Sequence, residues 1–188
     1  MGGILHVCTA NQCRSPMAER IMQARLAQRY GQRAASILIS SAGLKARPSA
    51  PIIPQALEQL KRRGINAEGF IATPLDPDAV ARAHLVLTAT RRQRDAVVAM
   101  VPIALRRTFT WRELAWLLQG VRPGDIPGAH LIHRVANVSS IAAGRRGYRR
   151  PPPPEAFDIE DPTGGPTSGY KRAATDIDTA VTAIVRSI

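Results

Sequence analysis

The residues with the clearest chemical potential occupy positions 8–15, which read Cys8-Thr9-Ala10-Asn11-Gln12-Cys13-Arg14-Ser15. Five residues separate the thiol of Cys8 from the guanidinium of Arg14. A loop of this length between a strand and a helix can turn successive backbone N–H groups inward and form an anion-binding nest. The N-terminus of the helix adds unpaired N–H groups and a positive dipole. This spacing is therefore typical of a loop that binds a tetrahedral oxyanion.

Cys8 and Arg14 supply the two side chains that chemistry on a bound oxyanion needs. An arginine that closes the loop can bind two oxyanion oxygens with its planar fork. The same positive surroundings favour the thiolate form of a cysteine at the base of the loop. A thiolate that faces a bound phosphate is arranged for nucleophilic displacement at phosphorus. The alternative reading is a small buried cysteine and a surface arginine, because this spacing also arises by chance.

A phosphoryl-transfer enzyme of this kind also needs a proton donor for the leaving group. The candidate is Asp161, which precedes Pro162 and the pair Gly164-Gly165. Asp, Pro and Gly all favour turns, so an ordinary turn residue is the competing interpretation. Asp158 and Glu160 are nearby carboxyl groups that compete for the same role.

The elements that must position these groups follow from the pattern of apolar residues and breakers. Ser15 is expected to cap the first helix, with Pro16 in its first turn. Strands alternate with helices, which predicts an α/β fold: a three-layer sandwich with a four-stranded parallel sheet flanked by helices. In such sheets ligands bind beyond the carboxyl ends of the strands, where residues 8–15 fall. The expected strands are 4–7, 36–41, 84–88 and 107–110, and the main expected helices are 15–31, 54–63, 91–101, 112–118, 129–143 and 167–188, with a short one opening at 76–78.

The 188 residues, 45% of them hydrophobic, are enough for a sizeable core and predict one domain over 1–188. An extended, partly flexible insertion is expected at about 111–155, because four consecutive prolines, Pro151 to Pro154, favour an exposed spacer. The net charge is +12, and 23 of the 26 basic residues are arginine. Without a basic run or interleaved aromatics, nucleic-acid binding is not expected as the main function.

Two cysteines do not make a secreted disulfide framework, and the four histidines have no zinc-ligand spacing. We therefore expect no metal and no cofactor. No apolar run approaches the length of a membrane span, and the first residues lack the basic start of a signal peptide. A soluble cytoplasmic protein without membrane insertion is the expectation.

Taken together, these segments resemble the low-molecular-weight protein tyrosine phosphatase family along almost the whole chain. The segments that carry the resemblance are 7–16, 40–43 (Ser-Ser-Ala-Gly), 63–65, 83–88 and 158–162 (Asp-Ile-Glu-Asp-Pro). The family fold, a four-stranded parallel sheet between helices, agrees with the strands expected here. The opening motif and the downstream Asp-Pro are specific as a pair.

The resemblance implies a role for each matching residue. Cys8 matches the nucleophile that forms a phosphocysteine, Arg14 the arginine that holds the phosphate, and Asp161 the general acid. Asn11 matches the residue that locks the loop, and Ser15 the hydroxyl that hydrogen-bonds the thiolate. The remaining loop residues, Thr9, Ala10, Gln12 and Cys13, are expected to help bind the substrate. Cys13 also matches the second loop cysteine, which can trap oxidised Cys8 as a reversible disulfide.

Three departures from the family pattern bear on the substrate. Ala10 stands where many members have glycine, and Thr163 and Gly164 follow the Asp-Pro where many carry aromatics that flank a phenol. The stretch 111–155 is longer than in a minimal member. Arg47 could line the mouth and favour acidic substrates, although solvated surface charge explains it as well.

The sequence thus predicts a metal-independent phosphomonoester hydrolase, a protein tyrosine phosphatase that acts on phosphotyrosine proteins or other aryl phosphates. The first alternative is an arsenate reductase on the same scaffold. Because no cysteine follows position 13, that enzyme would use a small thiol as its reductant. The second alternative is a basic phosphopeptide-binding module, which would not need the complete set of Cys8, Arg14 and Asp161.

Overall fold

The computed structural model describes residues 2–148 and 150–188, and its centre is a four-stranded parallel sheet in the order β2-β1-β3-β4. Cys8, the last residue of β1, pairs with Gly43 at the end of β2. Central strand β1 is buried at every position, as expected for a parallel sheet covered on both faces. The strands span Gly3–Cys8 (β1), Leu38–Gly43 (β2), Leu85–Thr88 (β3) and Thr108–Thr110 (β4).

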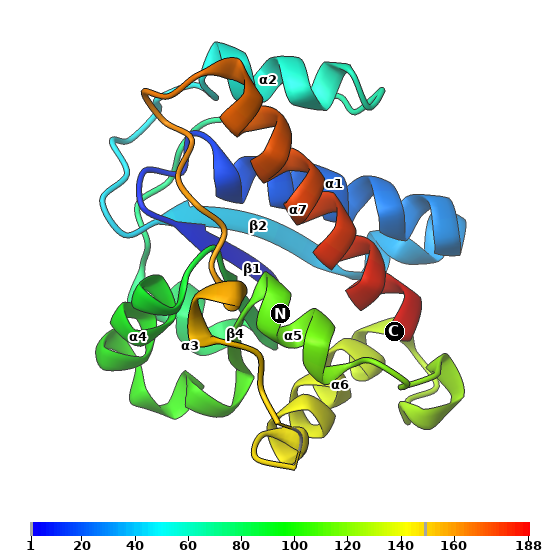
Figure 1. Cartoon of the computed structure of the whole chain (residues 1–188). Helices are drawn as coiled ribbons and strands as arrows, with labels where there is room; N and C mark the ends of the chain where they lie inside the picture. Colours follow the sequence, from blue (N-terminus) through cyan, green and yellow to red (C-terminus); the bar gives the residue numbers. More distant parts are fainter. Residues whose placement is uncertain (1, 149) are drawn as a thin grey trace.

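Helices cover both faces of this sheet and give the three layers seen in Figure 1. Two of them begin at a threonine capping box, with Thr90 before α4 and Thr110 before α5. The α-helices are Arg14–Tyr30 (α1), Pro54–Lys61 (α2), Pro77–Arg82 (α3), Arg91–Met100 (α4), Trp111–Leu117 (α5), Leu131–Arg145 (α6) and Thr167–Ser187 (α7). Short 3-10 turns occur at Gly31–Ser36, Pro102–Arg107, Pro123–Asp125 and Pro154–Phe157.

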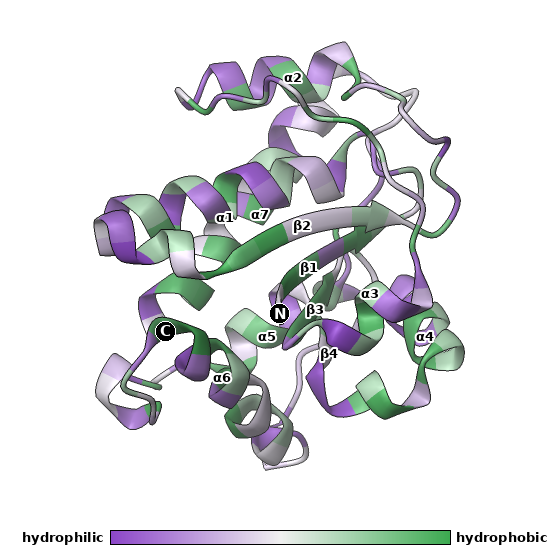
Figure 2. Ribbon diagram, turned by 180° about the vertical axis from the view of Figure 1, so that it is seen from behind, coloured by the Kyte–Doolittle hydropathy of each residue, from purple (hydrophilic) through white to green (hydrophobic). Residues whose placement is uncertain are grey.

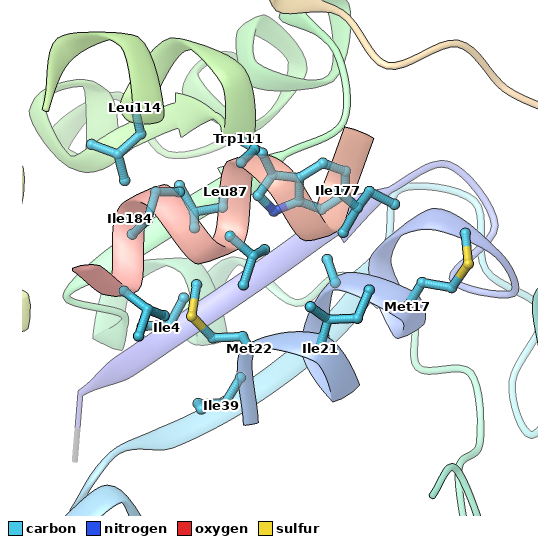
Figure 3. Packing of buried hydrophobic residues seen from close by; sticks show 14 of the residues in the cluster. Ile4, Met17, Ile21, Met22, Ile39, Leu87, Trp111, Leu114, Ile177 and Ile184 are labelled. Atoms are coloured by element: carbon cyan, nitrogen blue, oxygen red, sulfur yellow. The ribbon is translucent and has the colours of Figure 1, made fainter. Parts of the chain in front are cut away.

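The core lies mainly between the sheet and the α1, α5 and α7 side. Alternate residues of β1 point to opposite faces, so Ile4 joins this larger cluster and Leu5 joins a smaller one. Figure 3 shows Ile4 and Leu87 from the strands among Met22 of α1 and Ile184 of α7. Figure 2 shows hydrophilic and hydrophobic residues alternating along the helices. This packing fixes the start of α1 against the sheet, directly after β1.

The predicted elements are all present, with most ends shifted by one or two residues, as is usual for such boundaries. One local prediction is wrong: Ser15 does not cap α1. The helix begins at Arg14 with Cys13 at the capping position and no side-chain cap, because the Ser15 hydroxyl is engaged inside the preceding loop. The segment expected as an insertion, 111–155, holds α5 and α6, and Arg149 within it lies outside the described residues.

Candidate active site

The loop between β1 and α1 is fixed against the end of β2 by backbone hydrogen bonds. Leu44 N donates to Cys8 O over 3.0 Å, and Lys45 N donates to Thr9 O over 2.8 Å. A Cβ atom on Gly43 would lie 2.8 Å from both Asn11 N and Thr9 O, closer than a side chain tolerates. Glycine is therefore required at Gly43 so that the loop can approach the strand.

Asn11 locks the inside of the loop. Its backbone is left-handed, with φ of 54°, a conformation that asparagine adopts more readily than most residues. Its Nδ2 donates to Ser15 Oγ (2.9 Å) and to Ser41 Oγ (2.8 Å), and its Oδ1 accepts from Thr73 N (2.8 Å). The side chain is fully buried. One residue thus joins the loop, the first turn of α1, strand β2 and residue 73.

The Cys8 thiol lies at the base of this loop, buried and 3.0 Å from Ser15 Oγ. Ser15 Oγ accepts from Asn11 Nδ2, so its single hydrogen can go to Ala42 O at 3.4 Å or to a Cys8 thiolate at 3.0 Å. At the other end, Ser41 donates to Glu19 Oε2 over 2.6 Å. Burial raises the pKa of Glu19, and the bond from Ser41 opposes that shift. A buried series of hydrogen bonds therefore links Glu19 to Cys8 through the side chains of Ser41, Asn11 and Ser15.

Arg14 is 4% exposed and joins the loop to the C-terminal part of the chain. Its Nη1 donates to Ile159 O over 3.0 Å, and its Nη2 forms an ion pair with Asp161 Oδ2. Its Nε is buried and has no hydrogen-bond partner within residues 2–148 and 150–188. This N–H is therefore a donor that an oxyanion oxygen in the loop can satisfy.

Among the three competing carboxyl groups, only Asp161 lines the cavity at Cys8. Its side chain is about half exposed, and its Oδ1 accepts from Thr163 Oγ1 over 2.8 Å. Asp158 is instead paired with Arg91, whose backbone N donates to Asp158 Oδ1 over 2.7 Å. Glu160 is exposed and lines a neighbouring cavity of about 330 Å³. The geometry thus separates Asp161 from its neighbours.

The structure brings most of the predicted site residues into one small cavity of about 40 Å³. Its lining residues are Cys8, Ala10, Gln12, Cys13, Arg14, Ile53, Asp161 and Thr163. Thr9 does not line it, because its hydroxyl accepts from Gln93 Nε2 (3.0 Å) on α4. Gln12 donates through Nε2 to Pro51 O over 3.2 Å. Arg47 is exposed and is not among the lining residues.

Some residues of the site carry no chemical signature in the sequence. Glu19 lies one helical turn after Ser15 and reads as an ordinary helix residue, yet it is buried and holds Ser41. Ile53 reaches the cavity because its backbone N donates to Gln12 O over 3.0 Å. Ser41 and Gly43 lie at the carboxyl end of β2, beside the end of β1. This position at the strand end is the signal that indicates their contacts with the loop.

The two cysteines are both buried free thiols. Burial raises the pKa of the Cys13 thiol to about 12; negative charge at Cys8 and Asp161 adds to this shift, and Arg14 opposes it. Cys13 is therefore protonated at neutral pH.

Two features are absent from the part of the chain that the structure describes. In that part, no group of three or more His, Cys, Asp or Glu side chains is arranged to hold a metal ion. No helix there has both the length and the apolar character that crossing a bilayer requires.

The sequence of this chain is similar to a known family profile and to several known proteins. The family profile described as "Low molecular weight phosphotyrosine protein phosphatase" matches residues 3–115. A protein-arginine-phosphatase of Bacillus subtilis (strain 168) is 33% identical over 110 residues, 58% of this chain and 70% of the relative. A protein-arginine-phosphatase of Geobacillus stearothermophilus is 26% identical over 178 residues, 95% and 90% of the two chains.

A relative named for a different substrate is similar to the same part of the chain. The low molecular weight protein-tyrosine-phosphatase Ptp of Acinetobacter johnsonii is 32% identical over 106 residues, 56% of this chain and 69% of the relative. Among solved structures, the low molecular weight protein tyrosine phosphatase from T. tengcongensis superposes with a TM-score of 0.69. It covers the whole of both chains at 24% identity, a likeness in fold alone.

Proposed function

We propose a function from the premise that the chain belongs to the low molecular weight phosphotyrosine protein phosphatase family, a family of cysteine-dependent phosphatases. From that premise we propose that Cys8 is the nucleophile, that Arg14 and the loop bind the phosphoryl group, and that Asp161 is the general acid. The substrate we propose is a phosphorylated side chain of a protein, with phosphotyrosine or another aryl phosphate first. The observation that carries the proposal is that Cys8, Arg14 and Asp161 line one cavity.

In the first step the Cys8 thiolate attacks phosphorus, so that an S–P bond forms and the bond from phosphorus to the ester oxygen breaks. Asp161, as a carboxylic acid, gives its proton to the departing oxygen. Arg14 Nε, which has no partner within the described residues, and backbone N–H groups of the loop bind the non-bridging oxygens. The Ser15 hydroxyl donates to the sulfur, which is supported by its distance of 3.0 Å from Cys8 Sγ.

In the second step a water molecule attacks the phosphocysteine. The Asp161 carboxylate takes the proton from this water, the S–P bond breaks, and the Cys8 thiolate and inorganic phosphate are released. The loop residues Thr9, Ala10, Gln12 and Cys13 contribute backbone N–H groups or lining surface to the binding of the phosphoryl oxygens. Since the mechanism needs a reduced thiol, we propose that the protein works in a reducing compartment, the cytoplasm.

Phosphoarginine is the second candidate substrate, and the lining of the cavity is the observation that favours it. Within the described part of the chain, the cavity at Cys8 has no aromatic side chain that would flank a phenol ring. Three of its polar groups, the Gln12 amide, the Asp161 carboxylate and the Thr163 hydroxyl, can accept hydrogen bonds from a guanidinium. The relatives named protein-arginine-phosphatase support the same candidate.

The test is a comparison of kcat/KM for a phosphotyrosine peptide and for a phosphoarginine peptide of the same sequence, with arsenate plus a thiol reductant as a third assay. The proposal expects turnover of at least one phosphopeptide and no arsenate reduction. Cys8→Ser should abolish turnover of both peptides because a serine hydroxyl is a far weaker nucleophile than a thiolate. Arsenate reduction without phosphopeptide turnover, or full turnover by Cys8→Ser, would overturn the proposal.

A further inference from the structure

The polypeptide that precedes Asp161 is held by groups from helices α1, α4 and α5 and from Ala89, the residue that follows β3. The Asp158 side chain is paired with Arg91 at the start of α4. Ile159 N donates to Ala89 O over 2.8 Å, and Ile159 O accepts from Arg14 Nη1. Asp158 O accepts from Arg112 Nη1 over 3.0 Å. Three residues later the chain reaches Asp161.

Arg112 differs from the other three anchors because it also reaches the helix that follows Asp161. Arg112 lies in the first turn of α5, and its Nη2 forms an ion pair of 2.8 Å with Asp176 Oδ2 on α7. The same Nη1 that binds Asp158 O lies 3.4 Å from Ala156 O. One guanidinium therefore joins the chain before the Asp161 turn to the helix after it, and Asp176 lines the cavity beside that turn.

A general acid needs this kind of fixation. Its carboxyl group must come within hydrogen-bond reach of the departing oxygen, and a shift of about 1 Å can cost on the order of 10²-fold in rate. Asp161 itself is about half exposed, and the hydrogen bonds of its Oδ1 are to the neighbouring residue Thr163. Its Oδ2 is held by the buried Arg14, which must also engage the phosphoryl group. The position of Asp161 over Cys8 therefore depends on Arg14 and also on the backbone before it and α7 after it.

We infer that Arg112 is a positioning residue for proton transfer. It touches neither the phosphoryl group nor the leaving group; it holds the Asp161 turn at the distance that protonation of the leaving oxygen requires. This inference rests on the proposed function, since it assumes that Asp161 is the general acid. Arginine is suited to this task because its planar fork bridges two acceptors in fixed directions, whereas a lysine ammonium is a compact charge without that fixed geometry.

The experiment measures kcat/KM for two substrates, phenyl phosphate with a poor leaving group and 4-nitrophenyl phosphate with an activated one. kcat/KM reports the steps up to formation of the phosphoenzyme, in which the leaving group is protonated. Arg112→Met should lower kcat/KM for phenyl phosphate by about 10-fold to 100-fold, part of what a general acid contributes. For 4-nitrophenyl phosphate the loss should be under about 3-fold. Arg112→Lys should recover part of the phenyl phosphate rate.

Two further variants keep the test decisive. Asp176→Asn removes the charge at the other end of the bridge and should show the same leaving-group dependence with a smaller amplitude, so the test does not depend on the folding of Arg112→Met. Arg94→Met is the matched control. Arg94 lies on α4 and pairs with Glu113, a residue of the same helix α5 that carries Arg112, but Arg94 does not contact the Asp161 turn. It should change the two substrates equally.

The outcomes separate this inference from the proposed function. If Asp161→Asn is selectively slow on phenyl phosphate while Arg112→Met and Asp176→Asn change both substrates equally, the inference is wrong and the proposed function stands. If Asp161→Asn itself shows no dependence on the leaving group, the proposed acid is wrong and the inference falls with it.

Discussion

The phosphate loop, residues 8–15, and the acid segment, residues 156–163, face each other in the site but are built in opposite ways. The loop is contiguous, and its shape follows from a strand end, a helix start and the left-handed Asn11. The acid segment has little structure of its own and is held by groups from α1, α4 and α5. The proposed nucleophile therefore lies in a contiguous motif that contacts with β2 reinforce, whereas the proposed proton donor is placed mainly by tertiary contacts. We expect the two functions to be separable by mutation.

The largest separable effect is expected at Asp161. Asp161→Asn should lower kcat/KM for phenyl phosphate by on the order of 10² to 10⁴-fold, and for 4-nitrophenyl phosphate by much less, because only the poor leaving group needs the proton. Asp158→Asn is the matched control: it keeps an oxygen for the Arg91 backbone N–H and should cost far less. Equal losses for Asp161→Asn and Asp158→Asn would mean that the proton comes from elsewhere.

A second effect, in the loop, is expected at Asn11. Asn11→Gly keeps the left-handed backbone but removes three buried hydrogen bonds, and should lower the free energy of unfolding by about 1–3 kcal/mol. Asn11→Ala should cost about 1 kcal/mol more, because alanine resists the left-handed conformation. Both variants should lose kcat/KM on phenyl and 4-nitrophenyl phosphate by similar factors. A loss selective for phenyl phosphate would show that loop and acid segment are not separable.

The sequence predicts the loop more fully than the acid segment, because the loop is contiguous whereas the acid segment is held by tertiary contacts. The four strands and the loop that joins Cys8 to Arg14 in one cavity could be predicted, because Cys8, Arg14 and the strand patterns are local signals. A serine before a proline usually caps a helix, so the local pattern predicts a cap at Ser15. The family resemblance instead implies that its hydroxyl meets the Cys8 thiol, and the folded loop places the two atoms 3.0 Å apart. Asp161 could be proposed from its Asp-Pro turn, but the contact of Arg112 with Asp158 joins residues 46 apart and leaves no local pattern.

A smaller expected effect within the loop is the pH dependence of disulfide formation between Cys8 and Cys13 after oxidation. A sulfenic acid formed on Cys8 by peroxide can be attacked by a Cys13 thiolate, giving a Cys8–Cys13 disulfide and hydroxide. Because burial raises the pKa of Cys13 to about 12, the thiolate is scarce, and disulfide formation should accelerate about tenfold per pH unit from pH 7 to 9. Quenched peptide mass spectrometry measures this rate. Cys13→Ser should lose recovery of activity by dithiol; unchanged recovery would remove Cys13 from this role.

The smallest expected effect is on the free energy of unfolding and arises from His6, a buried residue of β1. His6 is fully buried, its Nδ1 accepts from Trp111 Nε1 over 2.8 Å, and burial lowers its pKa to about 3. Between about pH 6.5 and 3 the unfolded chain binds a proton that the folded chain does not. The His6 contribution to the free energy of unfolding is therefore complete above pH 6.5 and declines as the pH falls towards 3.

His6→Asn tests this contribution, because it keeps an acceptor for Trp111 and cannot titrate. From pH 7 to 5 it should lose about 2 kcal/mol less stability than the wild type, as measured by denaturant unfolding. His130→Asn, at an exposed position, is the control. Parallel pH profiles for wild type and His6→Asn would show that His6 does not titrate as its burial requires.

The measurement that tests the central claim most directly is a rapid-quench experiment with 4-nitrophenyl phosphate. If Cys8 attacks phosphorus, the wild type should release a first burst of nitrophenol close to one equivalent per enzyme, provided that hydrolysis of the intermediate is the slower step. The quenched protein should then carry one phosphoryl group on the peptide that contains Cys8, and Cys8→Ser should give no burst. A phosphoryl group on another residue, or steady turnover by Cys8→Ser, would contradict the account.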